Sequence, residues 1–324
     1  MEVVPENQKN VFRQVRSPLK SIGASFMRYK ISVIIVNYNT SSTLDTCLSS
    51  LEKQRDSIHE VIVVDNASED DSVTLVKQNF PWVELIESPK NLGFGVANNL
   101  AFSQSSGDLL FLLNPDGYAE PGCLNSIMSY MASHPDIGMA GTATFNIDGS
   151  KQPTVEDEYP GQRYSPNTFM RLPGNIAWLL GAGLVIRREV MEQVQGFDPD
   201  YFLYGEDIDL SLRIRKASWP LGYIEAARIQ HVGGQSERTT PPEDLFTKKI
   251  KAELLFYRKH YSTKVVHRIA RIRYLEACWR LFSLKMQDLL FGCNARDRLK
   301  KIKYGVARQL YSLPRPGADS DGGC

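Results

Sequence analysis

Short runs of apolar residues recur through the first third of the chain, separated by polar loops and amphipathic segments. Four of them are rich in Val, Ile and Leu and show little alternation with polar residues, at 31–36, 61–64, 82–86 and 109–113. Such runs predict strands, and the run at 31–36 predicts a buried parallel strand. Apolar residues at helical spacing follow each of the first three runs. We therefore predict an α/β fold with a doubly wound, mainly parallel sheet flanked by helices.

The second half of the chain has a less regular pattern. Residues 148–173 are polar and rich in proline and predict a loop, whereas residues 178–186 predict a buried strand or turn. Apolar residues at helical spacing predict a helix over about 206–217. After Pro242 the pattern is strongly helical to about residue 310, so a helical extension is expected at the C-terminus.

Charge is distributed unevenly along the 324 residues, although the net charge is only +1. This near-zero balance argues against a protein that binds nucleic acid over its whole surface. Thirteen Lys and Arg nevertheless lie between residues 264 and 315, opposed only by Glu276, Asp288 and Asp297. The basic C-terminal segment points to an anionic partner surface.

The sequence predicts neither a secretion signal nor a membrane-spanning helix. The five cysteines are widely separated and form no CxxC pair, so they predict neither a disulfide framework nor a structural zinc site. A reducing compartment fits this pattern best. The polar N-terminus has no apolar run before a cleavage site, and the longest apolar stretch, 176–186, is too short to cross a bilayer. We expect a cytoplasmic protein.

Polar side chains follow the predicted strands at the point where each strand ends. Asn37, Asp65 and Asn91 follow the first three strands, and the loop Asn114-Pro-Asp116 follows the fourth. Ligands of doubly wound sheets bind beyond the carboxyl ends of the strands, so these side chains are expected to converge on one rim. Each of them alone could be a turn former. The side-chain oxygens of Asn114 and Asp116, two residues apart, could also hold a divalent cation.

Two further groups carry side chains suited to catalysis. Glu206 and Asp207 open a predicted helix, where the helix dipole favours carboxylates. They could be simple caps, or the aromatic residues just before them could desolvate a carboxylate and make it a useful base. His231 precedes two glycines and could be either a structural residue or a metal ligand.

The order of these segments resembles the motif series of the family-2 glycosyltransferases. The matching segments are Asp65-Asn-Ala-Ser68, Asn91-Leu-Gly-Phe-Gly-Val-Ala-Asn-Asn99, Leu113-Asn-Pro-Asp116, Gly196-Phe-Asp198, Phe202-Leu-Tyr-Gly-Glu-Asp-Ile-Asp-Leu210, Arg213-Ile-Arg215 and His231-Val-Gly-Gly234. Together they span roughly residues 31–236 and are most similar to the rhamnosyltransferase-like branch. The resemblance implies the GT-A fold and an enzyme that uses a nucleotide-diphosphate sugar.

The resemblance also implies roles for individual residues. Six of them would bind the nucleotide sugar: Asn37, Asp65, Asn91, Gly93, Asn98 and Asn114. Asp116 and His231 would hold Mg²⁺ or Mn²⁺. Asp207 would be the general base, with Glu206 beside it as a second catalytic carboxylate.

Two positions depart from the usual family pattern. Asn114 replaces the first acid of the metal-binding DxD motif, so weaker metal binding is expected. Asn98 stands where many relatives carry Arg, which removes a positive charge from the diphosphate region. Both substitutions are found in the rhamnosyltransferase-like branch.

The expected reaction is an inverting, metal-dependent transfer of L-rhamnose from dTDP-rhamnose. The acceptor would be a hydroxyl of a glycan or of a polyprenyl-diphosphate-linked glycan in cell-surface polysaccharide synthesis. A different donor such as a UDP-hexose, and a non-catalytic glycan-binding or scaffold protein, stay open as alternatives. A dinucleotide dehydrogenase is disfavoured because no GxGxxG follows the first strand.

Four segments are expected along the chain. They are a flexible arm at 1–29, a GT-A domain at 30–240 with nucleotide-binding (30–117) and acceptor or catalytic (118–240) halves, a basic helical extension at 241–312 and a disordered tail at 313–324. The extension could be a helical appendage or a dimer partner. It could also dock on the inner face of the cytoplasmic membrane, because basic amphipathic helices bind anionic lipid.

Overall fold

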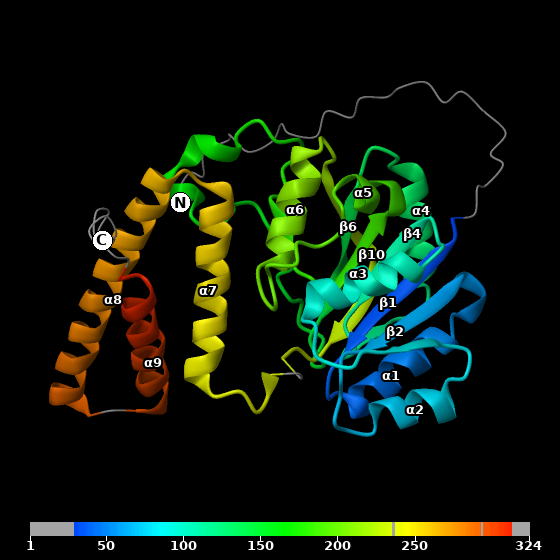
Figure 1. Cartoon of the computed structure of the whole chain (residues 1–324), viewed down its shortest axis with the longest axis horizontal. Helices are drawn as coiled ribbons and strands as arrows, with labels where there is room; N and C mark the ends of the chain where they lie inside the picture. Colours follow the sequence, from blue (N-terminus) through cyan, green and yellow to red (C-terminus); the bar gives the residue numbers. More distant parts are fainter. Residues whose placement is uncertain (1–28, 235–236, 293, 313–324) are drawn as a thin grey trace, which may run out of the picture.

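The computed structural model describes residues 29–234, 237–292 and 294–312, which form a sheet domain and a C-terminal group of helices (Figure 1). Two predicted segments, the arm at 1–29 apart from Tyr29 and the tail at 313–324, lie outside the described residues. Both the sheet domain and the helices contribute side chains to the candidate site.

One eight-stranded sheet organises the first domain. Its strands are β1 (Ile31–Asn37), β2 (Glu60–Asp65), β3 (Glu84–Glu87), β4 (Leu109–Leu113), β5 (Gly117–Ala119), β6 (Met139–Phe145), β9 (Gly183–Arg187) and β10 (Leu221–His231). They are ordered β3-β2-β1-β4-β9-β6-β10-β5. The pairs β2/β3, β1/β2, β1/β4 and β6/β10 are parallel, whereas β9 is antiparallel to both its neighbours and β5 is antiparallel to β10. The predicted mainly parallel sheet is confirmed.

Helices cover both faces of the sheet. On one face lie α1 (Ser41–Glu52), α2 (Ser72–Asn79) and α4 (Cys123–Ser133), and on the other lie α3 (Phe94–Gln104), α5 (Arg188–Gln193) and α6 (Glu206–Lys216). In β1, Ile31, Val33 and Ile35 enter the first core, while Ile34 and Val36 enter the second. Because both faces of β1, β2 and β4 are buried, these strands appear in the sequence as continuous apolar runs, whereas the edge strand β3 is only partly buried.

The region between β6 and β9 is more structured than the predicted loop. It contains a two-stranded sheet of β7 (Val155–Glu156) and β8 (Trp178–Leu179), and the short 3₁₀ helices η2 (Gln162–Tyr164) and η3 (Pro166–Phe169). Another 3₁₀ turn, η1 (Arg55–Ser57), precedes β2. The short connection from β8 to β9 passes the N-terminus of α6, where it takes part in the candidate site.

Three helices form the C-terminal group, as the apolar spacing predicts. They are α7 (Pro242–His260), α8 (Thr263–Phe291) and α9 (Ala295–Leu310), with α9 lying between α7 and α8 (Figure 1). A third apolar core joins them to α6 and to the segment around Tyr159 and Phe169. His260 Nε2 lies 2.7 Å from Asp209 Oδ1, which attaches α7 to α6. No helix in the described part of the chain combines the length and the apolar character needed to cross a bilayer.

Candidate active site

The loop after β4 meets the end of β10 at the carboxyl edge of the sheet. β5 pairs with β10 so that Gly117 lies opposite His231, and this register brings Asp116 next to the histidine. Asp116 Oδ1 lies 3.2 Å from His231 Nε2, and Asn114 Nδ2 lies 3.3 Å from the same nitrogen. Asp116 Oδ2 accepts a hydrogen bond of 2.9 Å from the N–H of Gly233. Strand pairing thus brings three predicted site residues together from two distant segments.

Gln152 orients the ring of His231 from its other nitrogen. Its Oε1 lies 3.1 Å from Nδ1 of His231, and its Nε2 donates to the His231 carbonyl at 2.8 Å. The Oε1 acceptor favours the tautomer with a proton on Nδ1, so Nε2 presents a lone pair toward Asp116. Two acceptor atoms that face each other at 3.2 Å are stabilised by a shared proton or cation.

The donor set around His231 and Asp116 suits a divalent cation. A carboxylate oxygen accepts Mg²⁺ or Mn²⁺, and an imidazole nitrogen is a ligand for transition metals. No cluster of three or more His, Cys, Asp or Glu suited to a metal was found among the described residues. Asp116 and His231 could therefore hold a cation only with further ligands from a bound molecule or from water.

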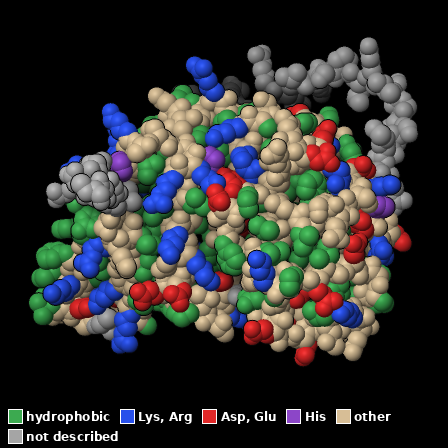
Figure 2. Space-filling model, viewed as in Figure 1, with side chains coloured by type: hydrophobic (Ala, Val, Ile, Leu, Met, Phe, Trp, Pro, Cys, Tyr) green, Lys and Arg blue, Asp and Glu red, His purple; other side chains and the backbone are tan. Residues whose placement is uncertain are grey.

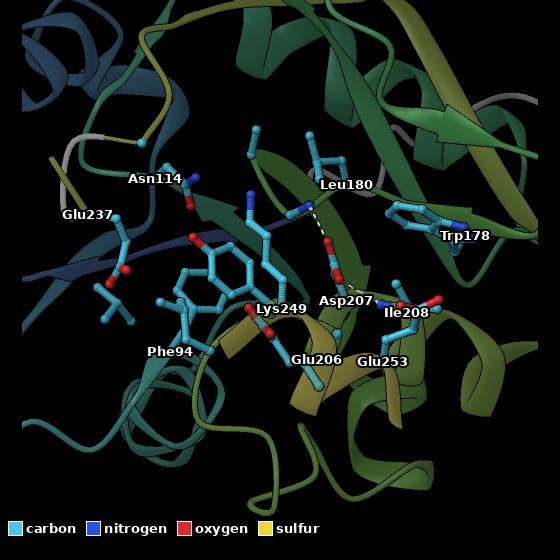
Figure 3. A pocket seen from close by; sticks show the side chains of 18 of the residues that line it. Phe94, Asn114, Trp178, Leu180, Glu206, Asp207, Ile208, Glu237, Lys249 and Glu253 are labelled. Carbon is cyan, nitrogen blue, oxygen red and sulfur yellow. Dashed lines mark hydrogen bonds between the residues drawn. The ribbon is translucent and has the colours of Figure 1, made fainter. Parts of the chain in front are cut away.

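The N-terminal turn of α6 carries the predicted catalytic carboxylates. Gly205 has a φ of +82°, and the helix begins at the next residue. Asp207 Oδ2 accepts a hydrogen bond of 3.2 Å from the N–H of Gly181, and its Oδ1 accepts one of 2.8 Å from the N–H of Ile208 (Figure 3). Burial raises the pKa of Asp207 to about 6, against the opposing effect of these hydrogen bonds. A carboxylate with this pKa suits a general base near neutral pH.

Glu206 lies beside Asp207 but in a more enclosed position. Its side chain is buried, and its Oε2 atom has no hydrogen-bond partner among the described residues. Burial raises the pKa of Glu206 to about 8, and the charge of Asp207 adds to the increase. Near neutral pH the pair therefore carries about one negative charge rather than two.

A single cavity of about 480 Å³ includes both groups in its wall. Asn114, Asp116 and His231 line it together with Glu206 and Asp207. Figure 3 shows the side chains of Asn114 and Asp207 on opposite sides of the cavity. Apolar side chains complete much of the remaining wall, namely Val36, Phe94, Pro160, Trp178, Leu180, Ile208 and Phe256. The cavity thus combines a candidate cation site, a candidate base and apolar surfaces.

Asn37 and Asp65 form a second group at the ends of β1 and β2. Asn37 Nδ2 donates to Asp65 Oδ2 at 2.9 Å and to Ser68 Oγ at 3.1 Å, and Asn37 Oδ1 accepts from Thr40 Oγ1 at 2.6 Å. Asp65 Oδ1 accepts a bond of 2.9 Å from the N–H of Ser68. Both Asn37 and Asp65 are buried, and neither lines the cavity, although the neighbouring Val36 does. Their contact with a nucleotide stays a prediction.

Asn66 has a structural role that the sequence motifs did not predict. Its Nδ2 donates to Asn91 Oδ1 at 3.0 Å, and its Oδ1 accepts a bond of 2.8 Å from the N–H of Leu92. Asn91 Oδ1 also accepts from the N–H of Gly93 at 2.9 Å. Asn66 therefore fixes the loop that precedes α3. Its place directly after Asp65, at a strand end, was the signal in the sequence.

Gly93 is the point where this loop touches the segment that leads to α6. Its φ is +79°, and a Cβ atom added there would lie 2.3 Å from the carbonyl oxygen of Phe202. That oxygen accepts a hydrogen bond of 2.9 Å from the N–H of Phe94. Asn98, by contrast, is buried on α3, and its Nδ2 donates to the Phe94 carbonyl at 2.9 Å. Asn98 lies outside the cavity wall, so its predicted contact with the donor is untested.

Helix α7 contributes to the cavity although it lies beyond the predicted limit of the GT-A domain at residue 240. Lys249, Ala252, Glu253 and Phe256 are in the wall. Lys249 is the single Lys or Arg among the described residues of this wall, and its Nζ lies 5.0 Å from the centre of the Tyr204 ring. Sequence reasoning missed these residues because only the tertiary packing of α7 with α6 brings them to the cavity.

Comparisons with known proteins identify relatives of this chain. Residues 32–195, about half of the chain, match the family model described as Glycosyl transferase family 2. An N-acetylglucosaminyl-diphospho-decaprenol L-rhamnosyltransferase of Mycobacterium tuberculosis is 27% identical over 250 residues, covering 66% of this chain and 80% of that protein. The uncharacterized glycosyltransferase YwdF of Bacillus subtilis is 36% identical over 195 residues, covering 58% of this chain and 68% of that protein.

A solved structure shares the architecture. The mannosyltransferase PcManGT of Pyrobaculum calidifontis, in complex with GDP-Man and Mn²⁺, superimposes with a TM-score of 0.56 at 16% identity. The alignment covers 88% of this chain and 87% of that one. At this identity the likeness shows the fold, and it confirms the GT-A architecture that the motif series predicts.

Proposed function

Because the chain belongs to glycosyl transferase family 2, we propose that this glycosyltransferase moves L-rhamnose from dTDP-rhamnose to a hydroxyl of a glycan. The acceptor is a glycan of cell-surface polysaccharide synthesis, free or linked to a polyprenyl diphosphate. The reaction inverts the anomeric carbon, so a β-linked donor gives an α-linked product. The observation that carries the proposal is the presence of Asp207 in the same cavity as Asp116 and His231.

Asp207 acts as the general base in this proposal. The acceptor oxygen bonds to the anomeric carbon, its proton passes to Asp207, and the bond from the anomeric carbon to the diphosphate oxygen breaks. The N–H groups of Gly181 and Ile208 hold the carboxylate in place, which reduces the reorganisation needed for proton transfer. General-base assistance contributes about 10²–10⁴-fold to such a rate. A single displacement with one base accounts for inversion.

Asp116 and His231 would hold Mg²⁺ or Mn²⁺ together with oxygens of the donor diphosphate. A cation at this position supplies Lewis-acid stabilisation of the departing diphosphate. The fit of an aspartate oxygen and an oriented imidazole nitrogen supports this assignment, and the nitrogen favours Mn²⁺ over Mg²⁺. Asn114 in place of an acid leaves the site with one negative charge fewer, consistent with a modest metal affinity.

Lys249 supplies a fixed positive charge to the same cavity. A lysine ammonium pairs with phosphate oxygens as a point charge, so it stabilises the diphosphate as its negative charge grows. The uncharged amide of Asn98 cannot supply this charge. We therefore assign the cationic role to Lys249 of α7.

The choice of rhamnose is supported by the relative from Mycobacterium tuberculosis, whose name specifies an L-rhamnosyltransferase acting on N-acetylglucosaminyl-diphospho-decaprenol. Its alignment with this chain covers 80% of its length. The apolar cavity wall around Trp178 and Leu180 also suits a 6-deoxy sugar, whose methyl group replaces a hydroxymethyl group.

A donor screen tests the proposal. The purified full chain is incubated with dTDP-rhamnose, UDP-glucose or GDP-mannose, in Mg²⁺, Mn²⁺ or EDTA, with a polyprenyl-diphosphate-linked N-acetylglucosamine acceptor. We expect release of nucleoside diphosphate and an α-linked product with dTDP-rhamnose, and loss of both in EDTA. Activity with a UDP-hexose alone would overturn the choice of sugar, and turnover undiminished by EDTA would overturn the metal assignment.

A further inference from the structure

An apolar stripe runs along the outer side of α8. All its members are at least 37% exposed. Six follow one another at intervals of three or four residues, namely Ile272, Leu275, Trp279, Phe282, Met286 and Leu289, and Leu290 adjoins the last of them. This spacing places them on one face of the helix, over a length of about 27 Å at the rise of an α-helix. An exposed apolar surface of this size marks an interaction site.

The opposite face of α8 already has partners in the fold. Ile269, Ala277 and Leu284 point into the protein, and the helix packs against α9 and α7. Figure 1 shows α8 at the outer edge of the C-terminal group, farthest from the sheet. The stripe therefore faces away from the catalytic domain, and no described element covers it.

Positive charge surrounds the stripe. Five exposed cations lie on α8, namely Lys264, Arg268, Arg271, Arg280 and Lys285. The two acidic residues of the helix are already in ion pairs, Glu276 with Arg273 and Asp288 with Lys301. Figure 2 shows hydrophobic side chains with Lys and Arg around them at this end of the molecule. The charge that remains along the stripe is cationic.

We propose that α8 docks this enzyme on an anionic lipid bilayer, lying in the interface with its apolar stripe among the acyl chains. Trp279 and Phe282, both more than half exposed, fit this position because aromatic rings favour the headgroup boundary. The cations of α8 gain attraction from anionic headgroups. In addition, α8 follows α7 after two residues, so docking ties the helix that carries Lys249 to the membrane-bound helix.

The apolar stripe could also bind the α8 helix of a second copy of the chain, but the positive charges of the two helices would repel each other. In a face-to-face pair of α8 helices, five exposed cations of one copy would lie along five of the other. Like charges at this spacing repel, whereas an anionic surface attracts all of them. Bulky Trp279 and Phe282 also occupy positions where helix pairs favour Leu, Ile and Val.

Vesicle cosedimentation of the full chain tests the proposal. Vesicles of phosphatidylglycerol and phosphatidylcholine are compared with vesicles of phosphatidylcholine alone, at low and high salt. We expect the wild type to pellet with anionic vesicles and to be released by salt, which screens headgroup attraction. Trp279→Glu with Phe282→Glu should weaken this binding by at least about tenfold. Arg271→Gln with Arg280→Gln and Lys285→Gln should weaken it by about tenfold or more for anionic vesicles.

A matched control separates the stripe from a general effect of added charge. Ile147→Glu with Met170→Glu introduces the same two carboxylates at side chains that are 72% and 71% exposed but lie outside α8. This control should bind vesicles like the wild type. A wild type that stays in the supernatant, or a control that loses as much binding as the stripe variant, overturns the proposal. So does a wild-type dimer by light scattering that only the stripe variant converts to a monomer.

Discussion

The Oδ2 atom of Asp207 accepts a hydrogen bond of 3.2 Å from the backbone N–H of Gly181, which joins the first turn of α6 to the connection between β8 and β9. This contact holds the carboxylate at the cavity wall, and no Lys or Arg among the described residues forms an ion pair with it. Desolvation of the carboxyl group therefore raises its pKa without a cation to offset the effect.

Asp207→Asn tests the assignment of the general base. The amide has nearly the same shape but cannot accept the proton of the acceptor hydroxyl, so kcat should fall by about 10²–10⁴-fold. Donor affinity measured by calorimetry should stay within a few-fold of wild type, because Asp207 acts on the acceptor. Asp136→Asn, at an exposed carboxylate, is the matched control and should keep full activity. An Asp207→Asn enzyme with near-normal kcat would contradict the mechanism.

The raised pKa of Asp207 predicts an acidic limit to activity. The base must be ionised, and its pKa of about 6 lies above the ordinary value of 3.8, so kcat/KM should fall about tenfold per pH unit below pH 6.

The free energy of unfolding should change with pH in the opposite direction to the activity. A carboxyl whose folded pKa is raised contributes most below its unfolded pKa and loses that contribution as pH rises through about 6 for Asp207 and about 8 for Glu206.

The pH profile therefore needs a measurement of folding beside it. Circular dichroism and the Tm at pH 5 should show a folded protein while kcat/KM is already reduced. A profile that stays flat down to pH 4.5, or one that falls together with the loss of structure, would remove Asp207 as the titrating base.

The strands β1, β2 and β4 could be predicted because burial on both faces produces a continuous apolar run in the sequence. β6 could not, since Gly141, Thr142 and Thr144 interrupt its apolar pattern although all are buried. Thr142 Oγ1 satisfies its hydrogen-bonding need by donating to the Gly183 carbonyl of β9 at 3.2 Å. A polar residue with a partner on a neighbouring strand looks, in sequence, like a loop residue.

Some residues of the candidate site could likewise be predicted from the sequence, and others could not. Asp116, Asp207 and His231 follow from motif order, and the structure places them in one cavity. Gln152 and Lys249 could not be predicted, because neither lies in a motif or at a strand end. Gln152 reaches His231 through the packing of the 148–154 segment, and Lys249 reaches the cavity only because α7 packs along α6. Contacts set by tertiary packing leave no local pattern in the chain.

Gly93→Ala tests the close contact between the loop before α3 and the segment that leads to α6. The new Cβ would lie 2.3 Å from the Phe202 carbonyl oxygen, so one of the two backbones must move. We expect a loss of stability greater than the roughly 1 kcal/mol usually associated with replacing a glycine at positive φ. Gly122→Ala is the control, since its φ is +84° but an added Cβ meets no atom within 4 Å. Equal midpoints for the two variants in urea unfolding would contradict this reading.

Lys249→Met tests whether α7 takes part in the reaction. Methionine keeps the length and the apolar stem of lysine but removes the positive charge from the cavity wall. If the charge stabilises the diphosphate of the donor, KM for the nucleotide sugar should rise by about tenfold, and product inhibition by free nucleoside diphosphate should weaken to a similar extent. Lys251→Met, two residues along the same helix and exposed outside the cavity wall, should leave both constants unchanged. If both substitutions raise KM equally, Lys249 acts only through the general positive charge of α7. If neither changes KM, α7 does not contact the diphosphate, and residues of the sheet domain alone bind it.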